Sequence, residues 1–288
     1  QSVLAKHTMG ATAFNAQIKG EPGHHTFFVY THQGEMDWWQ PVNIYIENTR
    51  KAPSYTDFAD IRPEKCRMVD FDRQLNASVT DIYQNEYLSP RSPYTTLQLP
   101  TQGIGEWCHP LLTATIDDSE LRSLVHHDTF QTSLGIPFRL KEKGNNILFT
   151  SLWDNYPDSS TISLSGTASH AYLLMAGSTN HMQCHIANGI IRIHYADGTS
   201  QATELTNVDG KAFQVPAPRP YRLHLKSGKV SRDLGKELNI TGVYGREIEG
   251  GAGILLDIPL DDSKELKGLT LETLSNDVVI GIMGITLQ

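Results

Sequence analysis

A short cluster near the middle of the sequence combines two aromatic residues with a carboxylate and an amide: Trp153, Asp154, Asn155 and Tyr156. Aromatic rings cover the apolar C–H face of a sugar, and Asp and Asn side chains hydrogen-bond its hydroxyl groups. These residue types, side by side, therefore predict a carbohydrate-binding platform. In the alternative interpretation Trp153 is a core residue, and Asp154 and Asn155 hold a turn.

A second pair of aromatic residues, Trp38 and Trp39, offers another candidate surface for carbohydrate. Neighbouring residues on a strand point to opposite faces of the sheet. We therefore expect one indole ring to be buried and the other to be exposed for binding. In the alternative interpretation both rings seal a domain interface.

Carboxylates could also act in pairs as the acid and base of a glycoside hydrolase. Such a pair faces one cleft, with the carboxyl groups about 5 to 5.5 Å apart in retaining enzymes and about 6.5 to 9.5 Å apart in inverting ones. Each available carboxylate also fits an ordinary role in a turn, a helix cap or the surface, so both interpretations stay open. The candidates are Asp57, Asp60, Asp81, Glu106, Asp117, Asp118 and Asp154.

Metal-binding patterns are scarce, although the chain has 12 His and 3 Cys. His181 and His185 have a spacing that converges on a helix, but in a strand they would be roughly 13 Å apart. No CxxC or HExxH motif occurs, so we expect no cofactor and no transition-metal site. A structural calcium ion is left open, because oxygen-rich loops near Asp154 and at Asp261–Asp262 could supply its ligands.

Composition narrows the function classes. The 288 residues carry a formal net charge of −8 and no Lys/Arg-rich run, which argues against a nucleic-acid partner. No GxSxG, GxxxxGK[ST] or dinucleotide-binding pattern follows a strand, so acyl transfer and nucleotide chemistry find no support. No apolar stretch approaches the roughly 20 residues of a membrane span. The chain starts at Gln1 without an apolar signal segment, and we expect a mature product whose signal peptide is absent from this sequence.

Alternation of apolar and polar residues at every second position is the dominant pattern. In Tyr221–Lys226 the side chains of Tyr221, Leu223 and Leu225 share one face, as in a half-buried strand. The same pattern in Gly189–Tyr195 is followed by Asp197-Gly198, which predicts a type I′ hairpin turn. Further strands are expected at 26–31, 42–47, 94–99, 146–151, 161–165, 171–176, 200–205, 255–259, 269–274 and 278–286.

Helical periodicity is limited to two short segments, 73–88 and 118–126, the second with Asp117 or Asp118 as its N-cap. Many short strands bounded by turn residues, with no βαβ rhythm, predict an all-β fold of the antiparallel β-sandwich class. We expect a jelly-roll or galactose-binding-like sandwich over residues 135–288. Residues 1–134 are expected to form a loop-rich β region that packs on this second half.

Several segments carry a resemblance that extends over roughly residues 45–288. They are Tyr87–Pro110, Ile116–Ser119, Gly135–Phe138, Phe149–Pro157, Leu164–Asn180 and Leu274–Gly284. Together they resemble an uncharacterised domain-of-unknown-function family of secreted proteins from glycan-degrading bacteria. The resemblance implies the β-sandwich portion of larger candidate glycoside hydrolases, whose separate helical, toroid-like catalytic domain has no counterpart in this strand-rich chain. It also implies a secreted or periplasmic location.

These observations lead to one expectation about function and two alternatives. We expect a non-catalytic carbohydrate-binding or accessory β-sandwich of a secreted glycan-utilisation system, with an oligo- or polysaccharide as its partner. The first alternative is a glycoside hydrolase that uses a carboxylate pair. The second is a structural domain that docks on other glycan-utilisation proteins.

Overall fold

The computed structural model describes most of the second half of the chain and part of the first. The described residues are 23–33, 36–46, 58, 60–85, 115–153, 155–178, 186–208, 211–214, 218, 220–232, 239–241, 245–247, 250–276 and 278–288, with only the backbone described in 23–46, 207–214 and 239–247. The chain divides into two compact units, Gln1–Ser54 and Tyr55–Gln288. Described residues 58–134 therefore belong to the same unit as the strands that follow them.

The first unit contains one antiparallel hairpin, formed by β1 (Gly23–Gln33) and β2 (Met36–Ile46). β1 extends beyond the predicted segment 26–31 at both ends, whereas β2 begins before the predicted segment 42–47 and ends one residue short of it. In the register of the hairpin Tyr30 lies opposite Trp39, and Thr31 lies opposite Trp38. The two tryptophans thus occupy successive strand positions, while their side chains lie outside the described part of the structure.

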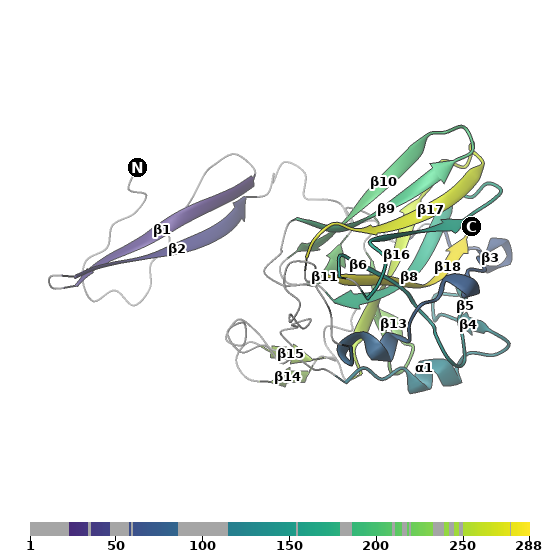
Figure 1. The fold of residues 1–288 in the computed structure, drawn as a ribbon, viewed down its shortest axis with the longest axis horizontal. Helices are drawn as coiled ribbons and strands as arrows, with labels where there is room; N and C mark the ends of the chain where they lie inside the picture. Colours follow the sequence, from purple (N-terminus) through teal and green to yellow (C-terminus); the bar gives the residue numbers. More distant parts are fainter. Residues whose placement is uncertain are drawn as a thin grey trace. The chain divides into compact units, whose positions relative to one another are not determined.

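The second unit is built around two antiparallel sheets (Figure 1). The larger sheet has the strand order β13-β12-β16-β8-β18-β3, with β6 also paired to β18, and the smaller sheet has the order β11-β10-β9-β17-β7. The strands of the larger sheet are β3 (Arg67–Met68), β6 (Leu148–Ser151), β8 (His170–Ser178), β12 (Tyr221–His224), β13 (Val230–Ser231), β16 (Ala252–Pro259) and β18 (Val279–Leu287). Those of the smaller sheet are β7 (Ser159–Ser163), β9 (Ala187–Tyr195), β10 (Ser200–Val208), β11 (Lys211–Gln214) and β17 (Leu266–Thr273). The predicted all-β, sandwich-like fold is confirmed.

The core between the two sheets follows from the alternation along each strand. Ile191 and Ile193 of β9 and Leu271 of β17 face Leu173 and Met175 of β8, and all five are buried. Because apolar side chains from both sheets meet in one continuous cluster, burial of this surface is the main stabilising contribution to the sandwich.

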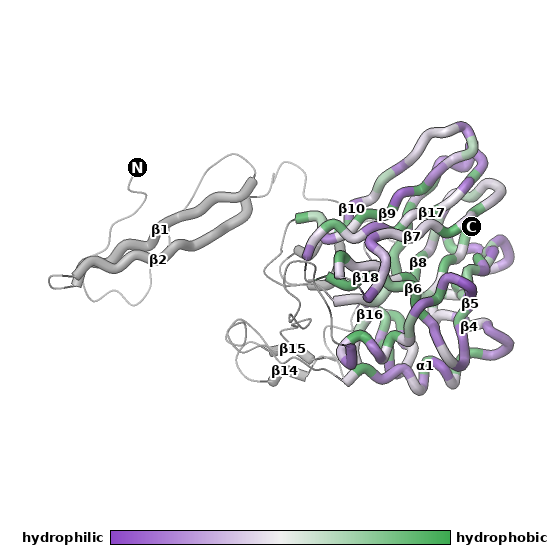
Figure 2. The backbone as a smooth tube through the Cα atoms, viewed as in Figure 1, coloured by the Kyte–Doolittle hydropathy of each residue, from purple (hydrophilic) through white to green (hydrophobic). Residues whose placement is uncertain are grey.

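The larger sheet is buried on its other face as well. Tyr172 and Leu174, which alternate with Leu173 and Met175 along β8, belong to a second apolar cluster. This explains why β6 and β18 are buried throughout and why β18 is hydrophobic along most of its length (Figure 2). The second cluster is covered by short elements from residues 60–140. They are the 3-10 helix η4 (Val79–Tyr83), the helix α1 (Ser119–Ser123), and the hairpin of β4 (Thr129–Gln131) and β5 (Pro137–Arg139). Two further 3-10 helices in this part of the chain, η2 (Pro63–Lys65) and η3 (Asp72–Gln74), contain no buried residue.

The predicted helix at 73–88 does not form over the described residues of that segment. The side chain of Asn76 donates to the Phe149 carbonyl at 2.9 Å and accepts from the Phe149 amide at 2.8 Å. These two hydrogen bonds to the backbone of β6 take the place of those that a neighbouring strand would make, and they keep the chain extended at Asn76. Only the short helices η3 and η4 flank it. The second predicted helix, 118–126, is present as α1 but is shorter, and the predicted strand 94–99 lies outside the described residues.

The hairpin between β9 and β10 has a different turn from the predicted type I′. Gly198 has a φ of +87°, whereas Asp197 is not among the described residues with positive φ. The Gly198 amide donates to the Tyr195 carbonyl, and the Tyr195 amide donates to the Thr199 carbonyl. The loop therefore has three residues, with glycine at the left-handed position of a bulge. The left-handed pair of a two-residue hairpin occurs instead at His127 and Asp128, with φ values of 51° and 55°.

Within the described residues, no helix has the length and apolar character needed to cross a membrane.

Two further small sheets complete the described part, one of them the β4–β5 hairpin and the other the pair β14 (Asn239–Thr241) and β15 (Gly245–Glu247).

Candidate functional site

The predicted carbohydrate platform is only partly at the surface. Trp153 is 3% exposed and packs in the second apolar cluster, so its ring presents no face to a ligand and the core interpretation holds for it. Asn155 is exposed and Tyr156 is half-buried, while Asp154 lies outside the described residues. The Tyr156 ring lies 5.2 Å from the ring of Phe149, and its hydroxyl accepts a hydrogen bond from Asn85 at 3.0 Å.

The end of β6 determines this arrangement. The Ser151 hydroxyl donates to the Val278 carbonyl at 2.8 Å and accepts the Trp153 amide at 3.3 Å. The Ser151 amide also donates to the Pro157 carbonyl, which closes the loop between Ser151 and Pro157 on itself. The closed loop turns Trp153 into the core and leaves Asn155 outside.

Two exposed apolar side chains lie at the same end of the sandwich as this loop. Ile186 is 46% exposed and Leu274 is 40% exposed. The Leu274 amide donates to the Asn188 carbonyl, and the neighbouring Thr273 amide donates to the Asp158 carbonyl, which places both segments beside the loop. The end therefore offers amide, phenol and aliphatic groups, but no exposed indole among its described residues.

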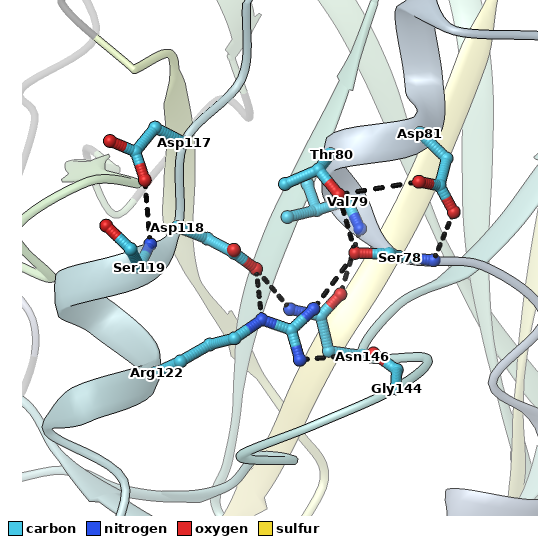
Figure 3. A network of polar contacts seen from close by, with 10 residues as sticks. All are labelled: Ser78, Val79, Thr80, Asp81, Asp117, Asp118, Ser119, Arg122, Gly144 and Asn146. Atoms are coloured by element: carbon cyan, nitrogen blue, oxygen red, sulfur yellow. Dashed lines mark hydrogen bonds and ion pairs between the residues drawn. The ribbon is translucent and has the colours of Figure 1, made fainter.

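Three of the candidate catalytic carboxylates take part in a structural network (Figure 3). Asp118 is 5% exposed and accepts hydrogen bonds from Arg122 Nε and Asn146 Nδ2, each at 2.8 Å. Arg122 also donates to the Ser78 hydroxyl at 2.9 Å and to the Gly144 carbonyl at 3.1 Å. The network joins α1 to η4 and to the loop before β6, so Asp118 acts as a brace between elements.

The other two carboxylates make local hydrogen bonds at the starts of helices. Asp81 accepts the Ser78 amide in a reciprocal capping box at the start of η4. Asp117 accepts the Ser119 amide at 2.9 Å at the start of α1, and these bonds to Ser119 lower the pKa of its carboxyl below the ordinary value. Asp57, Glu106 and Asp154 lie outside the described residues. Asp60 lines the pocket described next.

A pocket of about 280 Å³ lies where β8 begins and β18 ends. Its lining residues are Asp60, Arg62, Lys65, Ser169, His170 and Gln288. The loop from Ser151 to Pro157 lies at the opposite end of β8, because Ser151 pairs with Val279 and Val279 pairs with Ser178. At roughly 3.3 Å per residue, the two ends of β8 are about 26 Å apart.

A buried carboxylate holds the imidazole of His170 in this pocket. His170 Nδ1 lies 2.8 Å from Asp257 Oδ1, and the side chain of Asp257 is fully buried while that of His170 is 15% exposed. The second oxygen of Asp257 has no hydrogen-bond partner within the described residues. Because a carboxylate accepts, Nδ1 must donate, and the other ring nitrogen, Nε2, is left for a ligand.

Aromatic rings stack against the face of the imidazole. The His170 ring stacks on Tyr172 with centroids 5.8 Å apart and an interplanar angle of 5°, and Phe58 stacks on the same tyrosine at 5.9 Å. Burial, followed by the charge of Asp257, raises the pKa of Tyr172 far above the ordinary value. Tyr172 therefore stays protonated and acts as a rigid support.

Gln288 fixes the loop that forms the other wall. Its side-chain oxygen accepts the Arg62 amide at 2.6 Å, and its side-chain nitrogen donates to the Asp60 carbonyl at 2.9 Å. Cys66, a free cysteine, lies 4.0 Å from the same oxygen. Burial and the charge of Glu64 raise the pKa of the Cys66 thiol, so it stays protonated and unreactive at neutral pH.

Sequence reasoning missed this pocket. Asp257 stands inside the apolar run Ile254–Ile258, and a carboxylate in such a run signals a buried, paired charge. That signal was available, but nothing local identified His170, which is 87 residues away in the chain, as its partner.

Metal binding finds no geometric support in the described residues, where no group of three or more His, Cys, Asp or Glu is placed to hold an ion. At the predicted calcium loop, Asp261 accepts from the amide and hydroxyl of Ser263, and Lys264 lies 3.1 Å from Asp197 and 4.0 Å from Asp261. An ammonium group thus occupies the space between the two carboxylates. The candidates His181 and His185 lie outside the described residues.

Comparison with known proteins adds no assignment: no protein-family model, no curated protein and no solved structure matches this chain.

Proposed function

We propose that this chain is a non-catalytic, carbohydrate-binding β-sandwich of the galactose-binding-like class, and that it serves a secreted glycan-utilisation system. The observation that carries the proposal is the pocket beside His170. Its walls combine an imidazole, a carboxylate, a guanidinium group and hydroxyl or amide groups, which are the side chains that hydrogen-bond sugar hydroxyls in directional pairs.

The arrangement favours binding over catalysis. A nucleophile activated by His170 would lie within hydrogen-bond reach of its free nitrogen. The nearest candidates have other roles: the Ser169 hydroxyl donates to the Gln288 carbonyl, and the Cys66 thiol stays protonated. The rigid support under the imidazole suits a preorganised hydrogen-bond donor or acceptor.

A glycan array scored together with thermal shift tests the proposal. Binding to the native state raises the melting temperature, so a glycan that fits should stabilise the chain. His170→Gln should remove both signals. His194→Gln is the matched control, because this half-buried histidine bonds to Thr270 on the other sheet. Equal glycan binding by the His170→Gln protein would refute the pocket as the site.

The second candidate is a glycoside hydrolase that uses a carboxylate pair. Asp60 lines the pocket and Asp257 is bonded to His170 in its wall, so a ligand there would have two carboxyl groups beside it. Release of reducing ends from a bound polysaccharide, abolished by Asp257→Asn with binding retained, would establish this alternative. Binding without release would exclude it for the polysaccharides tested.

A further inference from the structure

The charges that line the pocket beside His170 are unequal in number. Two cationic side chains, Arg62 and Lys65, face one carboxylate, Asp60. All three are exposed, and within the described residues none of them forms an ion pair. Lining cations without a protein partner are available to a ligand, and a concave site strengthens their combined field.

The imidazole lies in the same pocket wall as these two cations. With Nδ1 donating to Asp257, the other ring nitrogen, Nε2, is left as an acceptor for a ligand hydroxyl group. The charged groups near this ring are Asp257, Asp60, Arg62 and Lys65, and Tyr172, which stacks on it, is neutral. A negatively charged ligand group would therefore meet donors from Arg62 and Lys65 together.

We propose that the pocket takes a sugar unit carrying a carboxylate or a sulfate group, an inference that rests on the proposed carbohydrate-binding function. Arg62 can hold either group through two parallel hydrogen bonds, and Lys65 supplies a point charge. The volume of about 280 Å³ lies at the lower end of ligand pockets, which suits one sugar unit better than a long segment. Asp60 remains to accept from a hydroxyl of the same sugar.

Calorimetric titration of the full chain tests the proposal with four monosaccharides: galacturonate, glucuronate, galactose 6-sulfate and galactose. We expect at least one acidic sugar to bind about 10-fold more tightly than galactose, a difference of about 1.4 kcal/mol. The preference should shrink as salt is raised, because mobile ions screen charges at a partly open site. A uronate preference and a sulfate preference distinguish the two sources of charge.

Substitutions assign the preference to the pocket. Arg62→Gln and Lys65→Gln should each reduce the acidic-to-neutral ratio several-fold, and the double variant should bind both sugars alike. Lys143→Gln is the matched control, because Lys143 is exposed and is not among the pocket residues. The three cationic side chains are exposed, so these variants should fold normally.

The possible results separate the charge preference from carbohydrate binding itself. Galactose binding as tight as acidic-sugar binding, lost in His170→Gln, overturns the charge preference and leaves carbohydrate binding intact. Sodium sulfate that binds as tightly as galactose 6-sulfate also overturns the inference, because the sugar then contributes nothing. Failure of all four sugars and of the glycan array overturns both proposals.

Discussion

His170 Nδ1 lies 2.8 Å from Asp257 Oδ1 and joins the first residue of β8 to the interior of β16, where the carboxylate is wholly shielded from solvent. The pair therefore connects stability to the pocket. The imidazole is the only bonded neighbour of the carboxylate among the described residues, since the second oxygen has none. Any change at His170 acts on a buried charge as well as on the proposed ligand site.

A double-mutant cycle measures this coupling. His170→Leu leaves the Asp257 carboxylate buried without a partner, and we expect the free energy of unfolding to fall by about 3 kcal/mol. His170→Leu combined with Asp257→Leu should cost less than His170→Leu alone, because no charge remains to be buried. Urea denaturation of the parent, of the single variants His170→Leu and Asp257→Leu, and of the double variant checks this. Losses that simply add would show that the two side chains do not interact.

The platform predicted from the sequence can be separated from the pocket. Asn155→Ala removes an exposed amide from the loop after β6, and Tyr156→Phe removes the hydroxyl bonded to Asn85. If the pocket is the site, the affinity for a glycan identified on the array should change less than about 2-fold in either variant, since surface changes away from a site cost little. A loss of about 10-fold in glycan affinity in Asn155→Ala would show that the loop after β6, and not the pocket, binds the glycan.

Loss of the Asp118 network should lower the free energy of unfolding more than loss of the neighbouring Asp117–Ser119 bond. Asp118→Ala leaves Arg122 Nε and Asn146 Nδ2 without their acceptor in a largely buried place, and we expect a loss of about 2 to 3 kcal/mol in the free energy of unfolding. Asp117→Ala removes one exposed hydrogen bond from the Ser119 amide, with a loss of about 1 kcal/mol. Chemical denaturation gives both values, and equal losses would contradict the role of Asp118 as a brace.

A pH dependence of stability is expected from Asp72. Hydrogen bonds from Arg139 and Lys141 lower the pKa of its carboxyl below the ordinary value of 3.8. A lowered folded-state pKa means that the stabilisation is complete above about pH 4 and is lost as pH falls through the lowered value. Because the cluster is partly exposed, we expect less than about 1 kcal/mol.

Asp72→Asn gives the measurement for this effect. The variant should unfold at a lower temperature than the parent at pH 7, and the difference should disappear in acid, below the lowered pKa. Asp70→Asn serves as the control, because Asp70 is 67% exposed and its oxygen lies 3.6 Å from Arg139. A difference between parent and Asp72→Asn that persists in acid would point to a cause other than charge.

The local pattern of apolar and polar residues was sufficient to predict the strands that have one face in solvent. Alternation in β9 and β12 identified both strands, because one face packs on the core and the other stays polar. The all-β class followed from many such segments. Where a side chain replaces a backbone partner, as Asn76 does beside Phe149, local pattern failed and predicted a helix.

The sequence by itself determined that this chain is an all-β, sandwich-like protein, because the period of hydrophobicity is a local property of each strand. Tertiary structure decided that the larger sheet is covered on both faces, that Trp153 is buried, and that His170 meets Asp257. These features depend on which strands become neighbours and on what covers them, and such contacts join residues far apart in the chain. The pocket beside His170 exists because β8, β16 and β18 lie next to one another in the sheet, with Gln288 holding the loop around Arg62 over their ends.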